Sequence, residues 1–354
     1  MPVVSSVRRI TSLSRVSAWL MVAALFLYLI NNYLVYWQDM PGPYRLLIAL
    51  GWMVERSAAE LSPASLTRGW LQLAAYAGVL VMVVVYAFSA GYRSLTVDAQ
   101  RLEQLAAYLV RAAFWSVLLV GFFDMLISFL RIEKLLELWL DDALLLELGR
   151  PAFRAAYVHL PLMITSLLLA LVFHRISFSW LALLVVLAEF QIVISRFVFS
   201  YEQVFMGDLV RFWYAALFLF ASAHTLVSEA HVRVDVLYAG FSRVQKAWSN
   251  ILGSLLLGMP LCWVILMQGM GGKGNSINSP LLNVEISQSG YGMYVKYLMA
   301  GFLVVFAATM LIQFCSYVLF NIAKLIEPEQ STLETDAGNP QNAARPQPVS
   351  SSTA

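Results

Sequence analysis

The chain is divided into long apolar blocks that are separated by short polar segments. A helix that crosses a bilayer needs about 20 mostly apolar residues, and several of the blocks reach that length. They predict about eight transmembrane helices, at residues 17–37, 70–90, 107–130, 157–174, 178–199, 209–228, 250–269 and 296–320. The expected fold class is therefore all-α, a polytopic integral membrane protein.

Three further segments do not fit a transmembrane helix. Residues 44–54 are too short to span, and Arg45 and Glu55 flank them, so we expect a helix that lies in the membrane interface. Residues 131–150 place leucines at helical spacing with acids between them, which predicts a second amphipathic interfacial segment. Residues 327–354 are rich in Pro, Ser, Thr, Asn and Gln, and we expect a disordered tail.

Composition strengthens the membrane assignment. Hydrophobic residues make up 60% of the 354 positions and charged residues 12%, against roughly 45–50% and about 25% in soluble domains. A net charge of +2 gives no indication of nucleic-acid binding. The first apolar run is too long for a signal peptide and no small-residue cleavage site follows it, so it is interpreted as a membrane helix. Cys262 and Cys315 lack the spacing of a metal site or disulfide framework.

The distribution of basic residues predicts the orientation. With a cytoplasmic N-terminus, most of the basic loop residues fall on the cytoplasmic side, whereas the external segments are mixed or acidic. An even number of spans then returns the C-terminus to the cytoplasm of a bacterial cell, in whose inner membrane we place the chain. The basic residues assigned to the cytoplasmic side are Arg8, Arg9, Arg15, Arg93, Arg101, Arg175, Arg233, Arg243, Lys246 and Lys324.

Charged residues within a span are rare and often functional. Glu189 lies in the middle of the fifth span, with Gln191 two residues later and Arg196 near the external end, and Asp124 lies in the third span. These residues could form a proton or ion relay. They could also make polar contacts between packed helices or with a partner subunit, which we favour because no second intramembrane acid has a clear spacing from Glu189.

Two further polar groups lie at helix ends. Asp208 and Arg211 share one face at the external start of the sixth span, as their spacing of three requires, and are interpreted as a cap and an interfacial anchor. The segment after that span, residues 229–238, alternates polar and apolar positions. Its acid–base group could be a metal or catalytic site, but it also fits an ordinary ion-pair network. The polar residues of this group are Glu229, His231, Arg233 and Asp235.

The second half of the chain, about residues 178–325, resembles the small membrane subunit of tripartite ATP-independent periplasmic (TRAP) transporters, the DctQ-type family. The first of the four family helices carries a glutamine and later an arginine followed by an aromatic–valine run, matched by Gln191 and Arg196-Phe-Val-Phe199. The second opens with Trp-x-Glu-Glu-x-x-Arg, where this chain has Phe205-Met-Gly-Asp208-Leu-Val-Arg211. The tryptophan is missing there and one Asp replaces the Glu pair.

The most specific match follows the second family helix. The family has a Glu-His-hydrophobic-Arg-Val-Asp run on the cytoplasmic side, which residues 229–235 reproduce with Ala230 inserted. A Glu-x-Ser element before the fourth helix is present as Glu285 and Ser287. The resemblance leaves the first 175 residues outside the family pattern, as an additional four-helix region before a small-permease domain at 176–326.

The resemblance implies a function without catalysis, metal or other cofactor. A periplasmic solute-binding protein delivers an organic anion, and a large permease subunit moves it with sodium. The small subunit acts as a scaffold in the lipid bilayer. The two alternatives are a self-sufficient secondary transporter and a haem-bearing membrane anchor. The first needs broken helices in two matching repeats, and Gly258-Met-Pro260 has no clear counterpart. The second needs two facing histidines, for which His174 and His224 are the candidates.

Overall fold

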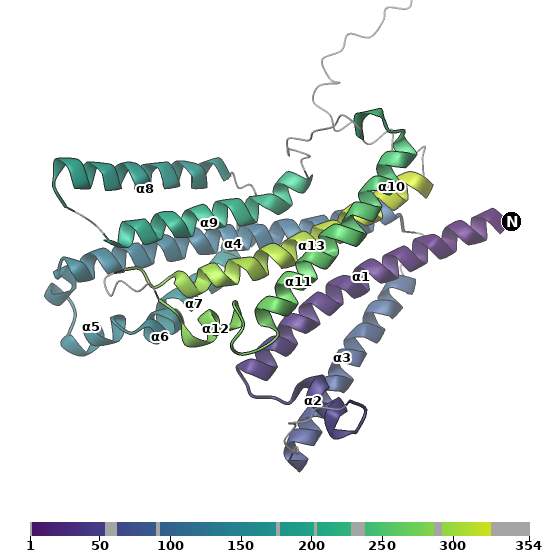
Figure 1. Cartoon of the computed structure of the whole chain (residues 1–354), viewed down its shortest axis with the longest axis horizontal. Coiled ribbons are helices and arrows are strands. Elements are labelled where there is room, and N and C mark those ends of the chain that lie inside the picture. The colour runs from purple at the N-terminus through teal and green to yellow at the C-terminus, as the bar shows by residue number, and fades with distance from the viewer. Residues whose placement is uncertain are drawn as a thin grey trace, which may run out of the picture.

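A computed structural model describes residues 2–53, 62–89, 93–174, 178–201, 204–227, 238–286 and 292–326. Throughout these ranges the regular structure is helical, and eight helical stretches are long and apolar enough to cross a membrane (Figure 1). The expected all-α membrane fold and its number of spans are thus confirmed. The tail at 327–354 lies outside the described residues.

The helical stretches that form the spans extend beyond their apolar centres. The fourth is the continuous run of α6, η2 and α7, and the seventh is the run of α10, η4 and α11. The helices of the first half are α1 (Pro2–Tyr36), α2 (Gly42–Ala49), α3 (Pro63–Ser89), α4 (Leu95–Ile132), η1 (Leu135–Leu138), α5 (Asp142–Leu148), α6 (Pro151–Arg154), η2 (Ala155–His159) and α7 (Leu160–Val172). Those of the second half are α8 (Phe178–Val198), α9 (Val204–Val227), η3 (Tyr238–Gly240), α10 (Arg243–Gly253), η4 (Ser254–Gly258), α11 (Met259–Met270), α12 (Asn278–Asn283) and α13 (Lys296–Ile326).

Two spans contain one wide π-helical turn each, and each turn is followed by a proline. In η2 the proline is Pro161, and in η4 it is Pro260. Proline has no N–H and its ring collides with the carbonyl four residues earlier, so the backbone hydrogen bonds shift locally to the wider π-helical pattern. The fourth span therefore supplies a counterpart to Gly258-Met-Pro260 that the sequence analysis did not find. Both spans remain helical on each side of the wide turn.

The short polar connections differ in how well they were predicted. Helix α2 ends at Ala49 and so covers only the first part of the expected helix at 44–54. It packs against α3, where Leu46 is fully buried beside Gly69. The prediction of one amphipathic segment across 131–150 is wrong as a continuous helix. Helix α4 runs to Ile132, and Lys134 then adopts a left-handed conformation with φ 56°. A 3₁₀ turn and the short α5 follow it.

Helix α4 lies at the centre of the molecule and packs against α7, α9 and α13. It contributes to both apolar cores. One core lies between α1, α4, α11 and α13, with Leu25, Leu102 and Leu311 fully buried. The other lies between α4, α8, α9 and α13 and contains Val120 and Phe302. The first and second halves of the chain therefore share their packing, as the neighbouring ribbons of α4, α9 and α13 show (Figure 1).

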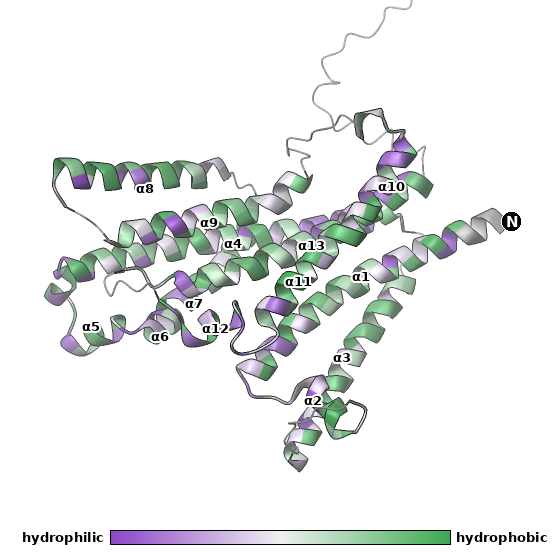
Figure 2. Ribbon diagram, viewed as in Figure 1, coloured by the Kyte–Doolittle hydropathy of each residue, from purple (hydrophilic) through white to green (hydrophobic). Residues whose placement is uncertain are grey.

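Two helices lie at the periphery. Helix α3 packs mainly on α1 and α2, and helix α8 mainly on α9. In Figure 2 the ribbon of α8 is hydrophobic along most of its length, including the side that faces away from the bundle. A helix that is apolar on all sides is typical of a membrane or of the interior of a large assembly.

Candidate functional site

A buried carboxylate joins three separate parts of the chain. Asp124 of α4 accepts hydrogen bonds at Oδ1 from Arg154 Nη1 at 2.9 Å, and its Oδ1 lies 3.1 Å from His159 Nε2. Its Oδ2 accepts a bond from the backbone N–H of Tyr294 at 2.8 Å. The side chains of Asp124, Arg154 and His159 are fully buried. Because an unpaired buried charge is strongly destabilising, this set of partners explains why Asp124 is tolerated within the bundle.

The partners of Asp124 are themselves held by further bonds. Arg154 donates to Ser128 Oγ at 3.0 Å and to the carbonyl of Leu148 at 2.8 Å. His159 Nδ1 lies 2.8 Å from Tyr297 Oη. The wide turn η2 contains His159, so the local widening before Pro161 helps to place this ring. The network therefore ties α4 and the α6–η2 run to the start of α13.

The aromatic ring of Tyr294 covers this network. The guanidinium carbon of Arg154 lies 4.2 Å from the ring centroid, a cation–π arrangement. The Tyr294 hydroxyl donates to the carbonyl of Gly149 at 2.9 Å and accepts a bond from Arg131 at 2.7 Å. Tyr294 thus fixes the segment before α13 against the end of α4.

A second buried ion pair lies at the other end of α4. Arg15 of α1 donates from Nε to Asp98 Oδ2 at 2.5 Å, and both side chains are buried. Arg15 also donates to the carbonyl of Arg93. Asp98 is in the first turn of α4, where the positive end of the helix dipole favours an acid, and Ser94 caps the same turn.

Three of the residues singled out in the sequence lie on the exposed side of α8. Glu189, Gln191 and Arg196 are all exposed. Gln191 donates to Ser195 Oγ at 3.1 Å. Glu189 and Arg196 make no hydrogen bond or ion pair with any residue that the structure describes. Their spacing of seven places them on one face of the helix.

Asp208 and Arg211 lie inside α9, past its first turn, so the expectation that Asp208 caps this helix is wrong. Arg211 Nη1 lies 3.5 Å from Asp208 Oδ1. Asp208 also accepts a bond from the backbone N–H of Met293 at 3.1 Å. Its side chain is 12% exposed, whereas that of Arg211 is 74% exposed. The structure therefore gives Asp208 partners within the chain and leaves Arg211 at the surface.

The remaining predicted residues, Glu229, His231, Arg233 and Asp235, lie outside the described residues. Of the two histidines proposed to face each other across a haem, His174 is exposed and bonds to the carbonyl of Val172. Among the described residues, no group of three His, Cys, Asp or Glu side chains is placed to hold a metal ion.

Asp124 could be identified from the sequence as a charge within a span, but its partners could not. Arg154 and His159 follow it by 30 and 35 positions, across a loop of mixed charge. A usable signal was present, because an acid within a span requires a basic partner and the next span opens with an arginine and a histidine. Arg15 and Asp98 were missed because Arg15 was assigned only to the orientation signal.

Comparison with known proteins bears on the part of the chain from α8 to α13. Residues 182–324 match the family described as tripartite ATP-independent periplasmic transporters, DctQ component. Comparisons with the curated proteins and with the solved structures gave no match. The match agrees with a multi-pass membrane protein and with a role in transport, and it leaves α1 to α7 outside. Residues 182–324 of this chain are therefore similar to the DctQ component of tripartite ATP-independent periplasmic transporters, and an additional helical region precedes them.

Proposed function

We propose that the chain is the scaffold of such a transporter in a bacterial inner membrane, with both termini in the cytoplasm. It supports a large permease subunit that takes up an organic anion, a carboxylate, together with sodium. A periplasmic solute-binding protein delivers the anion. In this proposal residues 176–326 form the small-permease domain and residues 1–175 an additional membrane region. The family match over residues 182–324 carries the proposal.

The surface of α8 supports a contact with another membrane subunit. Leu181, Ala188 and Ser195 recur every seven residues and are buried against the bundle. The opposite side exposes apolar side chains and Glu189, which has no partner among the described residues. An ionised side chain at the centre of a bilayer costs at least about 2.5–3.5 kcal/mol. A polar group on the large subunit facing Glu189 would remove that cost.

The two alternative functions have less support. Self-sufficient transporters commonly bind their substrate at unwound helix segments near the midplane of two repeats. Here the wide turn η2 lies at the start of its span and η4 near the middle of its own, and both spans stay helical. For a haem-bearing anchor, the ring Nδ1 of the candidate His174 lies 3.0 Å from the carbonyl oxygen of Val172.

Photo-crosslinking in native membranes tests the scaffold proposal. A photoreactive residue at Phe190 or Val193, both exposed on α8, should capture a large polytopic protein that mass spectrometry identifies. The matched controls are Val81 and Val85, which are equally apolar and exposed on α3. Glu189→Lys should reduce co-purification of that partner without altering the unfolding of the isolated chain. Recovery of the chain alone, or only as copies of itself, would contradict the proposal.

A further inference from the structure

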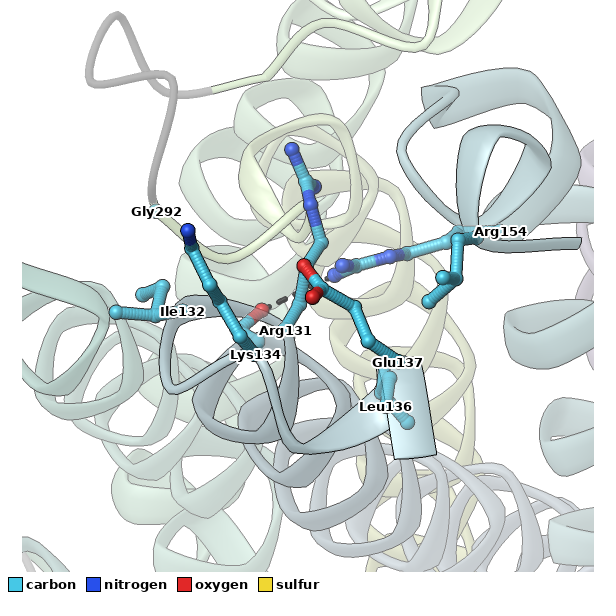
Figure 3. A pocket seen from close by; sticks show the side chains of 9 residues that line it. Arg131, Ile132, Lys134, Leu136, Glu137, Arg154 and Gly292 are labelled. Atoms are coloured by element: carbon cyan, nitrogen blue, oxygen red, sulfur yellow. Dashed lines mark hydrogen bonds between the residues drawn. The ribbon is translucent and has the colours of Figure 1, made fainter. Parts of the chain in front are cut away.

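A cavity of about 290 Å³ lies beside the buried network, at the end of α4 that we place toward the periplasm. It lies between the last turn of α4, η1, α5 and the segment before α13 (Figure 3). The residues that line it are Ser128, Arg131, Ile132, Lys134, Leu136, Glu137, Leu145, Arg154 and Gly292. Three of these side chains are basic and one is acidic, so the lining carries an excess of positive charge.

Arg154 supplies the donor that distinguishes this cavity from an ordinary basic surface. Its Nε and Nη1 are used by Leu148, Ser128 and Asp124, but its buried Nη2 has no hydrogen-bond partner. Figure 3 shows the guanidinium group of Arg154 pointing into the space between Arg131 and Glu137. Buried donors are nearly always satisfied. An unpaired guanidinium nitrogen at the wall of a cavity therefore indicates a missing acceptor.

Asp124 does not supply that acceptor. Its Oδ1 is shared by Arg154 Nη1 and His159, and its Oδ2 accepts the bond from Tyr294. Lys134 also lines the cavity, and its ammonium group makes no hydrogen bond or ion pair with any described residue. The ligand that matches these groups is an oxyanion that accepts hydrogen bonds from a guanidinium and an ammonium group.

The surroundings of the cavity favour a lipid as the source of the oxyanion. Leu138 and Trp139, next to Glu137, are 72% and 75% exposed, and Leu146 of α5 is also exposed. Exposed leucine and tryptophan at the end of a span are typical of the membrane interface, where tryptophan lies at the level of the headgroups. Apolar walls from Ile132, Leu136 and Leu145 complete the cavity.

We propose that this cavity binds a phosphate group, and that a phospholipid headgroup supplies it. Arg154 Nη2 and Lys134 Nζ bind the phosphate oxygens, and the leucines of η1 and α5 contact the glycerol and the first part of the acyl chains. Nearly all of the site comes from the additional region that precedes the part of the chain that matches the DctQ family. The inference does not depend on the proposed scaffold function.

The test uses the purified full chain after removal of co-purified lipid by detergent exchange. Phosphatidylglycerol is added and bound lipid is counted by native mass spectrometry. Inorganic phosphate is added separately, and the shift in thermal unfolding is measured. Lys134→Gln should weaken binding about tenfold, the effect of losing one charge-assisted hydrogen bond. Glu137→Gln should strengthen binding, because it removes the negative charge that lines the same cavity.

The variants are chosen so that folding is preserved. Lys134 and Glu137 are both exposed, and their side chains make no hydrogen bond or ion pair with a described residue. Lys273→Gln is the matched control, because Lys273 is an exposed lysine that pairs with Asp39 at 2.9 Å, away from the cavity. Opposite effects of the two variants on phosphatidylglycerol support the site and its lipid source. Opposite effects on inorganic phosphate alone support the site with a soluble source. The proposal would be overturned if the two substitutions changed the binding of neither probe.

Discussion

Arg154 and Asp124 form an ion pair of 2.9 Å in which neither side chain has any solvent exposure. Asp124 lies in the third span and Arg154 begins the fourth, and both contact Tyr294 in the segment before the eighth. Through Tyr294 this pair thus joins the additional N-terminal region to the part of the chain that matches the DctQ family. Its removal should affect the whole bundle rather than one loop.

Replacement of Asp124 by Asn should destabilise the chain by about 3–5 kcal/mol, because it leaves the charge of Arg154 buried without compensation. Unfolding in mixed micelles with increasing denaturing detergent measures the difference. Glu147→Gln is the matched control, since Glu147 pairs with Arg150 at 2.6 Å on the exposed surface. Exposed pairs contribute about 0–1 kcal/mol. Equal effects of the two substitutions would show that Asp124 is not a structural anchor.

The pair of Arg15 and Asp98 should behave as an independent anchor at the opposite end of α4. Arg15→Gln leaves Asp98 with only the more distant Arg93, at 3.7 Å, and should destabilise the chain by a similar amount. Because the two pairs share no residue, their effects in the double variant with Asp124→Asn should add within about 0.5 kcal/mol. A strongly non-additive result would indicate that the two ends of α4 are coupled.

A glycine allows the close approach of α4 and α9. A Cβ atom at Gly121 would lie 2.5 Å from Nε1 of Trp213, which is itself buried. Gly121→Ala should therefore lower the free energy of unfolding by about 1–3 kcal/mol, because the added methyl group overpacks this contact. Small residues commonly allow such close contacts between membrane helices. Gly78→Ala in α3 is the control, because nothing lies within 4 Å of its added Cβ. Equal unfolding midpoints for both variants would argue against the tight contact.

Two truncations separate the contribution of α4 from that of α1 and α3. Both remove an even number of spans and so preserve the predicted orientation. A chain that starts at residue 93 keeps α4 and should insert and co-purify with its partner, although it loses Arg15. A chain that starts at residue 176 loses α4 and the packing of both cores, and should be degraded. Full stability of the shorter chain, judged by protease resistance in membranes, would contradict the shared core.

Much of the fold could be predicted from the sequence, because the bilayer imposes a strong and local constraint. About 20 apolar residues in a row have few alternatives, so all eight spans were located. The ends were less predictable. Helix α4 extends well beyond the expected 107–130, because its polar residues Asp98 and Arg131 are stabilised by partners elsewhere in the chain.

The candidate site was only partly predictable, for a physical reason. Spacing along one helix reveals a shared face, as for Glu189 and Arg196, but it does not reveal partners on other helices. The bonds of Asp124 to Arg154, His159 and Tyr294 join residues 30, 35 and 170 positions apart. The break in 131–150 was also missed, because leucine periodicity predicts a helix and the left-handed turn at Lys134 has no glycine to mark it.

The two buried pairs place a mechanical constraint on α4. Asp98 and Asp124 are 26 positions apart, which corresponds to about 39 Å along a helix. A bilayer with its headgroup regions measures about 40–45 Å. This separation is close to the thickness of a bilayer, and the two ion pairs hold α4 toward both of its ends. Sliding of α1 along it would break the buried ion pair of Arg15 and Asp98, and sliding of the segment before α13 would break the hydrogen bond from Tyr294 to Asp124. In the proposed transporter, we therefore expect the cargo to move with another subunit while α4 and its neighbours keep their arrangement.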